Sequence, residues 1–407
     1  MSVPTPPATD GPIDHATLAR RSGVDDAAIE RLVDLGILER GEDGTFREQD
    51  ITAVRLSYAL EASGVSLDDV GDAIAGGALP PLGAVLLLPP VGLRPRTYRE
   101  AAAAFGLEPR SVAATMEALG LPDVDLDAPV REDDEELLQI AGSVLQAGLP
   151  EETTLRTLRI FAEHLDRMAE HQRTLFRRDV QDRMLATGMS RSQMLRESAA
   201  TREFLVQVSY RTSHLIHRRL LERNAFENTT EQLELLLEEA GVRRRPDRDP
   251  PAIVFVDLSG YTRMTEEEGD ERAAERGTEL AQVVRRAVGR HGGRVVKLLG
   301  DGAMVRFERA DAAVAAALDI VDAVDESPLP SAHVGIAAGA MIQRDGDYFG
   351  HTVNIAARLC DAATAGSILA TGNVAELTPG RDWRDVGDLE LRGVPEPVAA
   401  VELSPPD

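Results

Sequence analysis

Two aspartates in the C-terminal part of the chain adjoin short apolar runs. IVFVDL (253–258) carries Asp257 just before the turn SGYT, and RVVKLLGDGAMVRF (294–307) carries Asp301 between two glycines. Mg²⁺ is typically bound by few carboxylates together with phosphate oxygens. Two aspartates at neighbouring strand ends therefore predict a site for metal ions that also hold phosphate, although each aspartate alone is more often an ordinary turn residue.

A second group of polar residues lies in and around DYFGHTVNIAARL (347–359). Asp347 precedes a glycine turn, and Asn354 and Arg358 follow it four residues apart, so that they share one face of the expected helix. Lys297 lies in the strand before Asp301. Taken alone, these are a solvated aspartate, a surface arginine and a solvated lysine.

The elements that position these residues can be predicted from the same stretches. The β-branched and aromatic run 253–258 predicts a buried strand, residues 294–307 a hairpin with a Gly-Asp-Gly turn, and residues 332–342 a further strand. A helix is expected from about Met264. Strands that alternate with helices predict an α+β fold, a two-layer sandwich.

The first expected strand leads through a glycine turn toward a helix N-terminus, where free backbone amides favour anions. The backbone amides of Ser259, Gly260, Tyr261 and Thr262 are therefore predicted contacts for a triphosphate.

VFVDLSGYT, KLLGDG and DYFGHTVNIAARL, in this order, resemble the motifs of class III nucleotidyl cyclases across roughly residues 250–403. The resemblance implies a ferredoxin-like α/β sandwich as the catalytic domain and two Mg²⁺ or Mn²⁺ ions as cofactors. It also implies a homodimer, because in this family the metal-binding aspartates of one domain meet base- and ribose-binding residues of its partner. The roles it assigns are metal binding by Asp257, Asp301 and the backbone carbonyl of Leu258, purine recognition by Lys297 and Asp347, and ribose and transition-state orientation by Asn354 and Arg358.

The predicted substrate is ATP, which would be converted to 3′,5′-cyclic AMP and pyrophosphate. A lysine donor and an aspartate acceptor complement the ring nitrogen and the amino group of adenine. Guanine reverses this pattern, and sites built on hydrogen bonds reject such analogues by up to ~10⁴–10⁵. Guanylate-type members of the family typically carry Glu and a small residue where this chain has Lys297 and Asp347. A guanylate cyclase remains the alternative enzyme.

The N-terminal half contains an internal repeat. TLARRSGVDDAAIERLVDLGIL (17–38) is matched by REAAAAFGLEPRSVAATMEALGL (99–121), and one spacing relates Gly64 to Gly148 further along. Each copy predicts a helix–turn–helix unit, here assigned to residues 13–80 and 81–154. The first copy resembles the winged MerR-type module, which suggests a DNA reader with a nucleotide-sensing cyclase-like domain. The alternative is an all-α scaffold used for regulation.

The formal net charge of -25 favours the scaffold, because duplex affinity depends on phosphate neutralisation by Lys and Arg. The remaining regions predicted are a flexible tail (1–12), a long helical regulatory or dimerisation region (155–240), a linker (241–251) and the catalytic domain (252–407). The order of the regions resembles that of actinobacterial cyclases whose helical N-terminal domain inhibits catalysis and responds to pH.

Two histidines in the long helical region form a candidate pH sensor. His214 and His217 are three residues apart and share a helical face, and histidine has an ordinary pKa near pH 6.5. Two solvated or capping histidines are the alternative.

The composition and the N-terminal sequence predict the cellular compartment of the protein. The 407 residues are 43% hydrophobic, which is enough for globular cores. A single cysteine, Cys360, is typical of a reducing cytoplasm. The N-terminus lacks a signal-peptide pattern, and the apolar run at 79–93 is short and broken by proline. A cytoplasmic protein without stable membrane insertion is expected.

Overall fold

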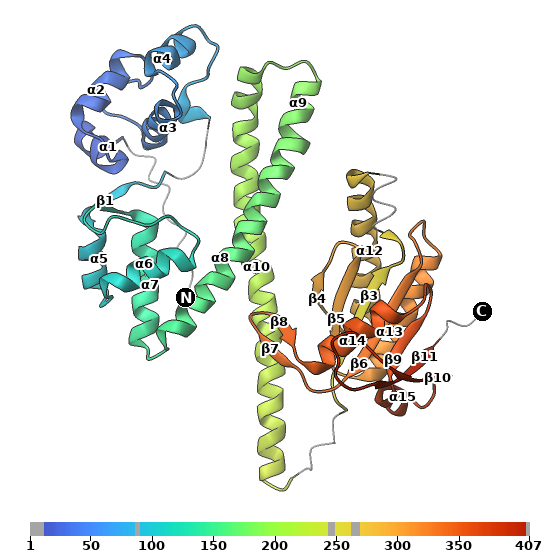
Figure 1. The fold of residues 1–407 in the computed structure, drawn as a ribbon. Coiled ribbons are helices and arrows are strands. Elements are labelled where there is room, and N and C mark those ends of the chain that lie inside the picture. Colours follow the sequence, from blue (N-terminus) through green and yellow to red (C-terminus); the bar gives the residue numbers. More distant parts are fainter. Residues whose placement is uncertain (1–11, 86–89, 243–248, 262–268, 404–407) are drawn as a thin grey trace. The chain divides into compact units, whose positions relative to one another are not determined.

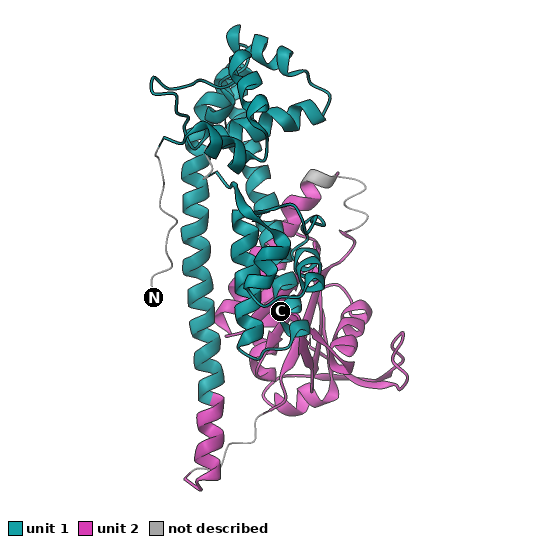
Figure 2. Cartoon of the chain, turned by 90° about the vertical axis from the view of Figure 1, so that its left-hand side faces the viewer, with its two compact units in different colours: residues 1–230 teal, residues 231–407 magenta. Residues whose placement is uncertain are grey.

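The computed structural model describes residues 12–85, 90–242, 249–261 and 269–403. Contacts divide the chain into two compact units, residues 1–230 and 231–407 (Figure 2), and each unit is described by itself. Most of the predicted tail and linker, at residues 1–11 and 243–248, lies outside the described residues.

The first unit begins with the two predicted repeats (Figure 1). Asp14 and Thr97 cap the first helix of each copy by accepting a hydrogen bond from a backbone N–H in the first turn. Gly23 and Gly106 follow the first helix of the first and second copy, with φ of 75° and 72°. Glycine adopts this left-handed conformation without strain. The first copy contains α1 (His15–Ser22), α2 (Asp26–Asp34), α3 (Asp50–Ala62) and α4 (Leu67–Ala75), followed by η1 (Leu82–Ala84); the second contains β1 (Leu93–Thr97), α5 (Tyr98–Ala104), α6 (Pro109–Ala118), β2 (Pro129–Arg131) and α7 (Glu132–Gln146).

One arginine joins the two repeats. The guanidinium of Arg21 in α1 contacts Glu48 at 2.6 Å and Glu132 at 3.1 Å. The two glutamates hold equivalent places in the two copies: Glu48 lies two residues before α3, and Glu132 is the first residue of α7. All three side chains are largely shielded from solvent, so the duplicated halves share one partly buried charge cluster.

Long helices follow the repeats: α8 (Glu151–Phe176), the π-helical turn η2 (Arg177–Gln181), α9 (Asp182–Ala186) and α10 (Arg191–Glu239). The structure confirms a long helical region and adds a turn between α9 and α10. Antiparallel contacts join α8 to α10, among them Met168 Sδ with Ser213 Oγ at 3.4 Å and Phe161 with His217 at 6.3 Å between ring centroids. In the described parts of the chain, no helix has both the length and the apolar character needed to cross a bilayer.

The second unit is built on a seven-stranded sheet in the order β10-β11-β9-β6-β3-β5-β4, shown in yellow to red in Figure 1. Neighbouring strands are antiparallel except for β6 and β9. The strands are β3 (Ala252–Leu258), β4 (Arg294–Leu298), β5 (Gly302–Phe307), β6 (Ala332–Ala338), β9 (Ile368–Thr371), β10 (Arg384–Leu389) and β11 (Val398–Leu403), with a separate hairpin of β7 (Ile342–Arg344) and β8 (Asp347–Phe349). The helices are α12 (Asp270–Arg290), α13 (Ala310–Asp325), α14 (His351–Ala362) and α15 (Gly372–Leu377).

Successive side chains of β3 point to opposite faces of the sheet and belong to two different cores. Val254 and Val256 are buried in the core formed with α12 and α13, whereas Ile253 is buried in a second core together with Val353 and Ala356 of α14. The predicted α+β fold is confirmed. The structure adds that α14 covers the face opposite to α12 and α13, so odd-numbered residues of β3, Asp257 included, are on the α14 side.

Candidate active site

Asp257 lies near the end of β3, where the sheet opens to solvent. Its side chain is 43% exposed. Burial of the remainder, followed by the charges of Asp301 and Asp361, raises the pKa of Asp257 to about 6. The site therefore disfavours an uncompensated carboxylate and favours one that is neutralised by a proton or a cation.

Asp301 is held beside Asp257 by the β4–β5 hairpin, as the sequence predicts. The Leu258 N–H donates to the Asp301 carbonyl at 3.0 Å, and Gly302 pairs with Asp257 across β3 and β5. A Cβ on Gly302 would lie 2.7 Å from the Val256 carbonyl and 3.0 Å from Asp257 Oδ1. Glycine at this position therefore leaves the space that the Asp257 carboxylate needs.

The two carboxylates fit a divalent cation that takes its other ligands from elsewhere. Burial and then the charge of Asp301 raise the pKa of Asp257, and a bound cation would offset both effects. In the part of the chain that the structure describes, no three or more His, Cys, Asp or Glu side chains are arranged to hold a metal ion by themselves. Mg²⁺ usually takes one or two carboxylates together with phosphate and water oxygens. Metal binding by Asp257, Asp301 and the Leu258 carbonyl stays a prediction.

One of the four backbone amides predicted to contact a triphosphate, that of Ser259 in the turn after β3, is already hydrogen-bonded within the protein. The Ser259 N–H donates to the Ser331 carbonyl at 3.0 Å, and Gly260 has a φ of 71°, which favours glycine. Tyr261 follows, half-buried. Thr262 and the helix start near Met264 lie outside the described residues.

Lys297 and Asp347, predicted to read the purine, lie in contact. Lys297 Nζ donates to Asp347 Oδ2 at 2.6 Å, and the Tyr348 N–H donates to Asp347 Oδ1 at 2.8 Å. Tyr348 is buried, and the Arg306 guanidinium lies over its ring at 5.3 Å. A solvent-accessible donor and acceptor are thus held side by side, with the acceptor anchored through its buried neighbour.

Asn354 and Arg358 project from α14 as predicted, one turn apart and both exposed. The helix lies directly on the sheet because β6 has a glycine below it. A Cβ on Gly335 would lie 2.2 Å from both the Ala356 carbonyl and the Cys360 nitrogen. Arg358 Nη1 donates to Asp361 Oδ2 at 2.5 Å within the same helix.

His333 is a site residue that was not among those predicted. It pairs with Asp257 across β3 and β6, with Nε2 3.4 Å from Asp257 Oδ2 and Nδ1 3.1 Å from Ser259 Oγ. Burial lowers the pKa of His333 despite the nearby charges of Asp361 and Asp301. The predicted strand 332–342 contained this residue, but nothing in that stretch shows which strand it would pair with.

Asp361 lies between two of the predicted residues: it is ion-paired with Arg358, and its charge helps to raise the pKa of Asp257. Among the described residues, no hydrogen bond or ion pair joins the carboxylates of Asp257 and Asp301 to Lys297, Asn354 or Arg358.

The comparison with known protein families now identifies this unit. Residues 245–402 match the family model described as the adenylate and guanylate cyclase catalytic domain. The second unit is a class III cyclase domain.

Relatives extend beyond the cyclase domain. An uncharacterized protein of Mycobacterium tuberculosis (strain H37Rv) is 28% identical over 359 residues, which are 86% of this chain and 89% of that protein. A protein named pH-sensitive adenylate cyclase, of M. tuberculosis strain CDC 1551, is 25% identical over 305 residues, 73% of this chain and 75% of its own length. Among solved structures, the adenylyl cyclase CyaB of P. aeruginosa is 23% identical and covers 40% of this chain and 96% of its own, with a TM-score of 0.36.

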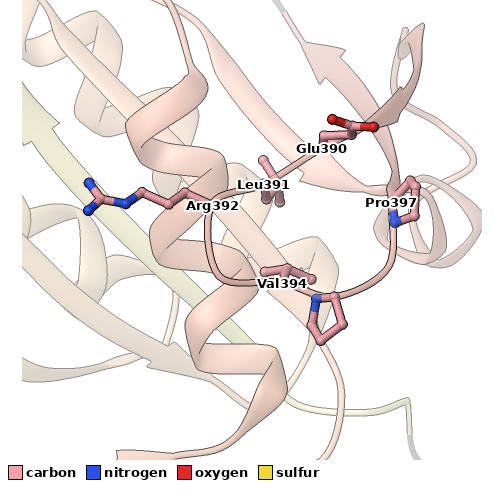
Figure 3. Close-up of a pocket in the computed structure, with 6 residues that line it drawn as sticks. Glu390, Leu391, Arg392, Val394 and Pro397 are labelled. Carbon is pink, nitrogen blue, oxygen red and sulfur yellow. The ribbon is translucent and has the colours of Figure 1, made fainter.

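The predicted pH sensor belongs to the first unit, and a hollow belongs to the second. His214 and His217 are both exposed on α10, and His217 contacts Phe161 of α8 edge to face. In the cyclase domain, a hollow at the β10–β11 loop (Figure 3) is lined by residues between Glu390 and Pro397. It contains none of the predicted site residues.

Proposed function

We propose that this protein is an adenylate cyclase that converts ATP to 3′,5′-cyclic AMP and pyrophosphate. The observation that carries the choice of base is the pairing of Lys297 Nζ with Asp347 Oδ2 at 2.6 Å. It sets a donor beside an acceptor, the pattern complementary to the adenine edge. Guanine would present both groups with the wrong partner, which hydrogen-bonding sites reject strongly. The name adenylate cyclase carried by a relative supports the same choice.

The reaction needs one in-line displacement at phosphorus. The ribose 3′-oxygen forms a bond to the α-phosphorus, the bond from that phosphorus to the bridging oxygen breaks, pyrophosphate leaves, and the hydroxyl proton passes to solvent. Phosphoryl transfer asks a protein mainly for positioning and charge stabilisation. Asn354 is suited to orient the ribose and Arg358 to neutralise charge on the α-phosphate, and losing such a donor typically costs ~10²–10³ in rate.

Asp257 and Asp301 are the residues that would hold two divalent cations, with the Leu258 carbonyl as a further ligand. Such ions, when bound, acidify the attacking hydroxyl and stabilise the leaving pyrophosphate. The turn at Gly260 and Tyr261 is proposed to offer backbone amides to the triphosphate, whereas the Ser259 N–H already donates to the Ser331 carbonyl.

The active form is proposed to be a homodimer with two equivalent composite sites. The match to the adenylate and guanylate cyclase catalytic domain supports this, because sites of that family combine residues of two catalytic domains. Asp257→Ala and Arg358→Ala variants should each be inactive, and mixing them should restore up to about a quarter of the activity, because subunits that mix at random form half heterodimers and each of these holds one intact site. No recovery after mixing under subunit exchange would contradict the shared site.

The N-terminal unit is proposed to regulate catalysis in response to pH. The relative named pH-sensitive adenylate cyclase aligns over most of the chain and supports this idea. His217 contacts α8 through Phe161, so protonation there would change the α8–α10 packing. Activity should rise on mild acidification, and replacing His214 and His217 together by alanine should flatten that rise. An unchanged profile in the double variant would remove the histidines from the proposal.

The direct test is to incubate the full chain with ATP or GTP and with Mg²⁺ or Mn²⁺, and to measure both cyclic nucleotides. Cyclic AMP as the main product is expected, and cyclic GMP as the main product would favour the guanylate alternative. A DNA mobility shift with a salt titration tests the DNA-reading alternative. That alternative is opposed by α2, the second helix of the first unit, whose exposed residues include Asp26, Glu30 and Asp34, since negative charge repels phosphate.

A further inference from the structure

His333 contacts two parts of the candidate active site at once. Its imidazole is 14% exposed, with Nε2 3.4 Å from Asp257 Oδ2 and Nδ1 3.1 Å from Ser259 Oγ. The first contact reaches a predicted metal ligand, and the second reaches the turn predicted to bind the triphosphate. One side chain therefore spans the strand end and the turn that follows it.

Nε2 is the ring atom that faces the carboxylate. The adjacent carboxylate favours the tautomer with the proton on Nε2, and in that tautomer the Ser259 hydroxyl donates to Nδ1. An Nε2–H at 3.4 Å from Asp257 is an electrostatic contact that orients the carboxylate without pairing it tightly. The second oxygen of Asp257 then stays available.

The backbone under His333 is rigid. β6 is a central strand, paired with β3 on one side and with β9 on the other. The Val334 N–H donates to the Ser367 carbonyl at 3.0 Å, and Gly335 lies beneath α14. A ring held by such a strand is well suited to fix a neighbour that is less constrained, and the Asp257 carboxylate is 43% exposed and repelled by Asp301.

We propose that His333 is a positioning residue, which orients the Asp257 carboxylate and the Ser259 turn together so that metal and triphosphate bind in one geometry. The inference rests on the proposed function, since it assumes that Asp257 holds a cation. It assigns no bond-making step to His333. Replacing a residue that contacts and orients a metal ligand typically lowers metal affinity or activity by ~10–100-fold.

Two substitutions separate the two contacts. His333→Gln can place an amide N–H near the position of Nε2 and so keep the contact to Asp257. His333→Asn is shorter and keeps at most the contact to Ser259. A matched control is His291→Asn, because His291 lies elsewhere in the cyclase domain and contacts a carboxylate of Asp319 at 3.1 Å.

The probe is Mn²⁺ together with 2′,3′-dideoxy-ATP, which lacks the attacking hydroxyl, and binding is measured by the electron paramagnetic resonance signal of free Mn²⁺. In the full chain, His333→Asn should weaken Mn²⁺ binding by ~10-fold or more, whereas His333→Gln and His291→Asn should stay within about threefold of wild type. Thermal unfolding establishes that each variant is folded. Where turnover is measurable, the Mn²⁺ concentration for half-maximal rate should rise in His333→Asn, with a smaller change in kcat at saturating metal.

Three outcomes would overturn the inference: Mn²⁺ binding in His333→Asn within twofold of wild type, equal weakening in His333→Gln and His333→Asn, or equal weakening in His291→Asn. Failure of the proposed function is distinguishable, because wild-type protein that binds Mn²⁺ and the nucleotide but forms no cyclic AMP would refute only the reaction. Wild-type protein that binds no Mn²⁺ with the nucleotide would overturn both.

Discussion

The raised pKa of Asp257 predicts that the charged carboxylate lowers the free energy of unfolding of the cyclase domain. Asp257→Asn removes the charge while keeping the size and an oxygen that can face His333. The change from the ordinary value of 3.8 to about 6 corresponds to ~3 kcal/mol as an upper limit. Because the side chain is 43% exposed, solvent screening reduces this to ~1 kcal/mol.

The sign follows from proton linkage. A carboxyl whose pKa is higher in the folded protein than in the unfolded chain binds its proton more tightly when folded, so the charged form destabilises the fold above about pH 6. Asp257→Asn should therefore stabilise the metal-free protein at pH 7–8, and this advantage should shrink between pH 6 and pH 4. For a domain of this size, ~1 kcal/mol raises the Tm by ~2–4 °C.

The assay is calorimetric unfolding of the full chain in EDTA, following the transition of the cyclase domain at several pH values. Asp319→Asn is the control with the opposite sign: burial acts to raise the pKa of Asp319, but His291 and Arg290 outweigh it and hold that pKa below its ordinary value. That variant should lower the Tm at neutral pH. An Asp257→Asn protein no more stable than wild type at pH 8, or a difference that does not depend on pH, would refute the electrostatic reasoning.

Two further predictions concern base choice and the regulatory unit. Replacing Lys297 by Glu and Asp347 by Ala should lower the ratio of kcat/KM for ATP over GTP by ~10² or more, measured from both cyclic products; an unchanged ratio would show that other residues read the base. Arg21→Met leaves the partly buried glutamate Glu132 without its cation and should destabilise the first unit by ~2–3 kcal/mol in urea unfolding. Arg99→Met removes an exposed pair and should change stability by less than ~1 kcal/mol; equal effects would contradict a special role for Arg21.

Much of the cyclase domain could be predicted from short-range patterns. The β-branched run ending near Asp257 and the Gly-Asp-Gly turn at Asp301 define strands and a hairpin through local preferences. The spacing of Asn354 and Arg358 fixes a shared helix face for the same reason. The repeats of the first unit can be recognised in the sequence because glycines recur at equivalent places after the first helix of each copy.

The sequence by itself determined which residue types stand at which spacing, and therefore the family of the second unit and the predicted metal, base and ribose groups. Only the tertiary structure decided that His333 lies against Asp257, that Gly335 lets α14 rest on the sheet, and that Arg21 joins the two repeats. These three contacts link positions far apart in the chain, and their formation depends on strand register and on the available space between packed elements. Neither is encoded in any single stretch, because pairing and packing are chosen by the whole set of elements together.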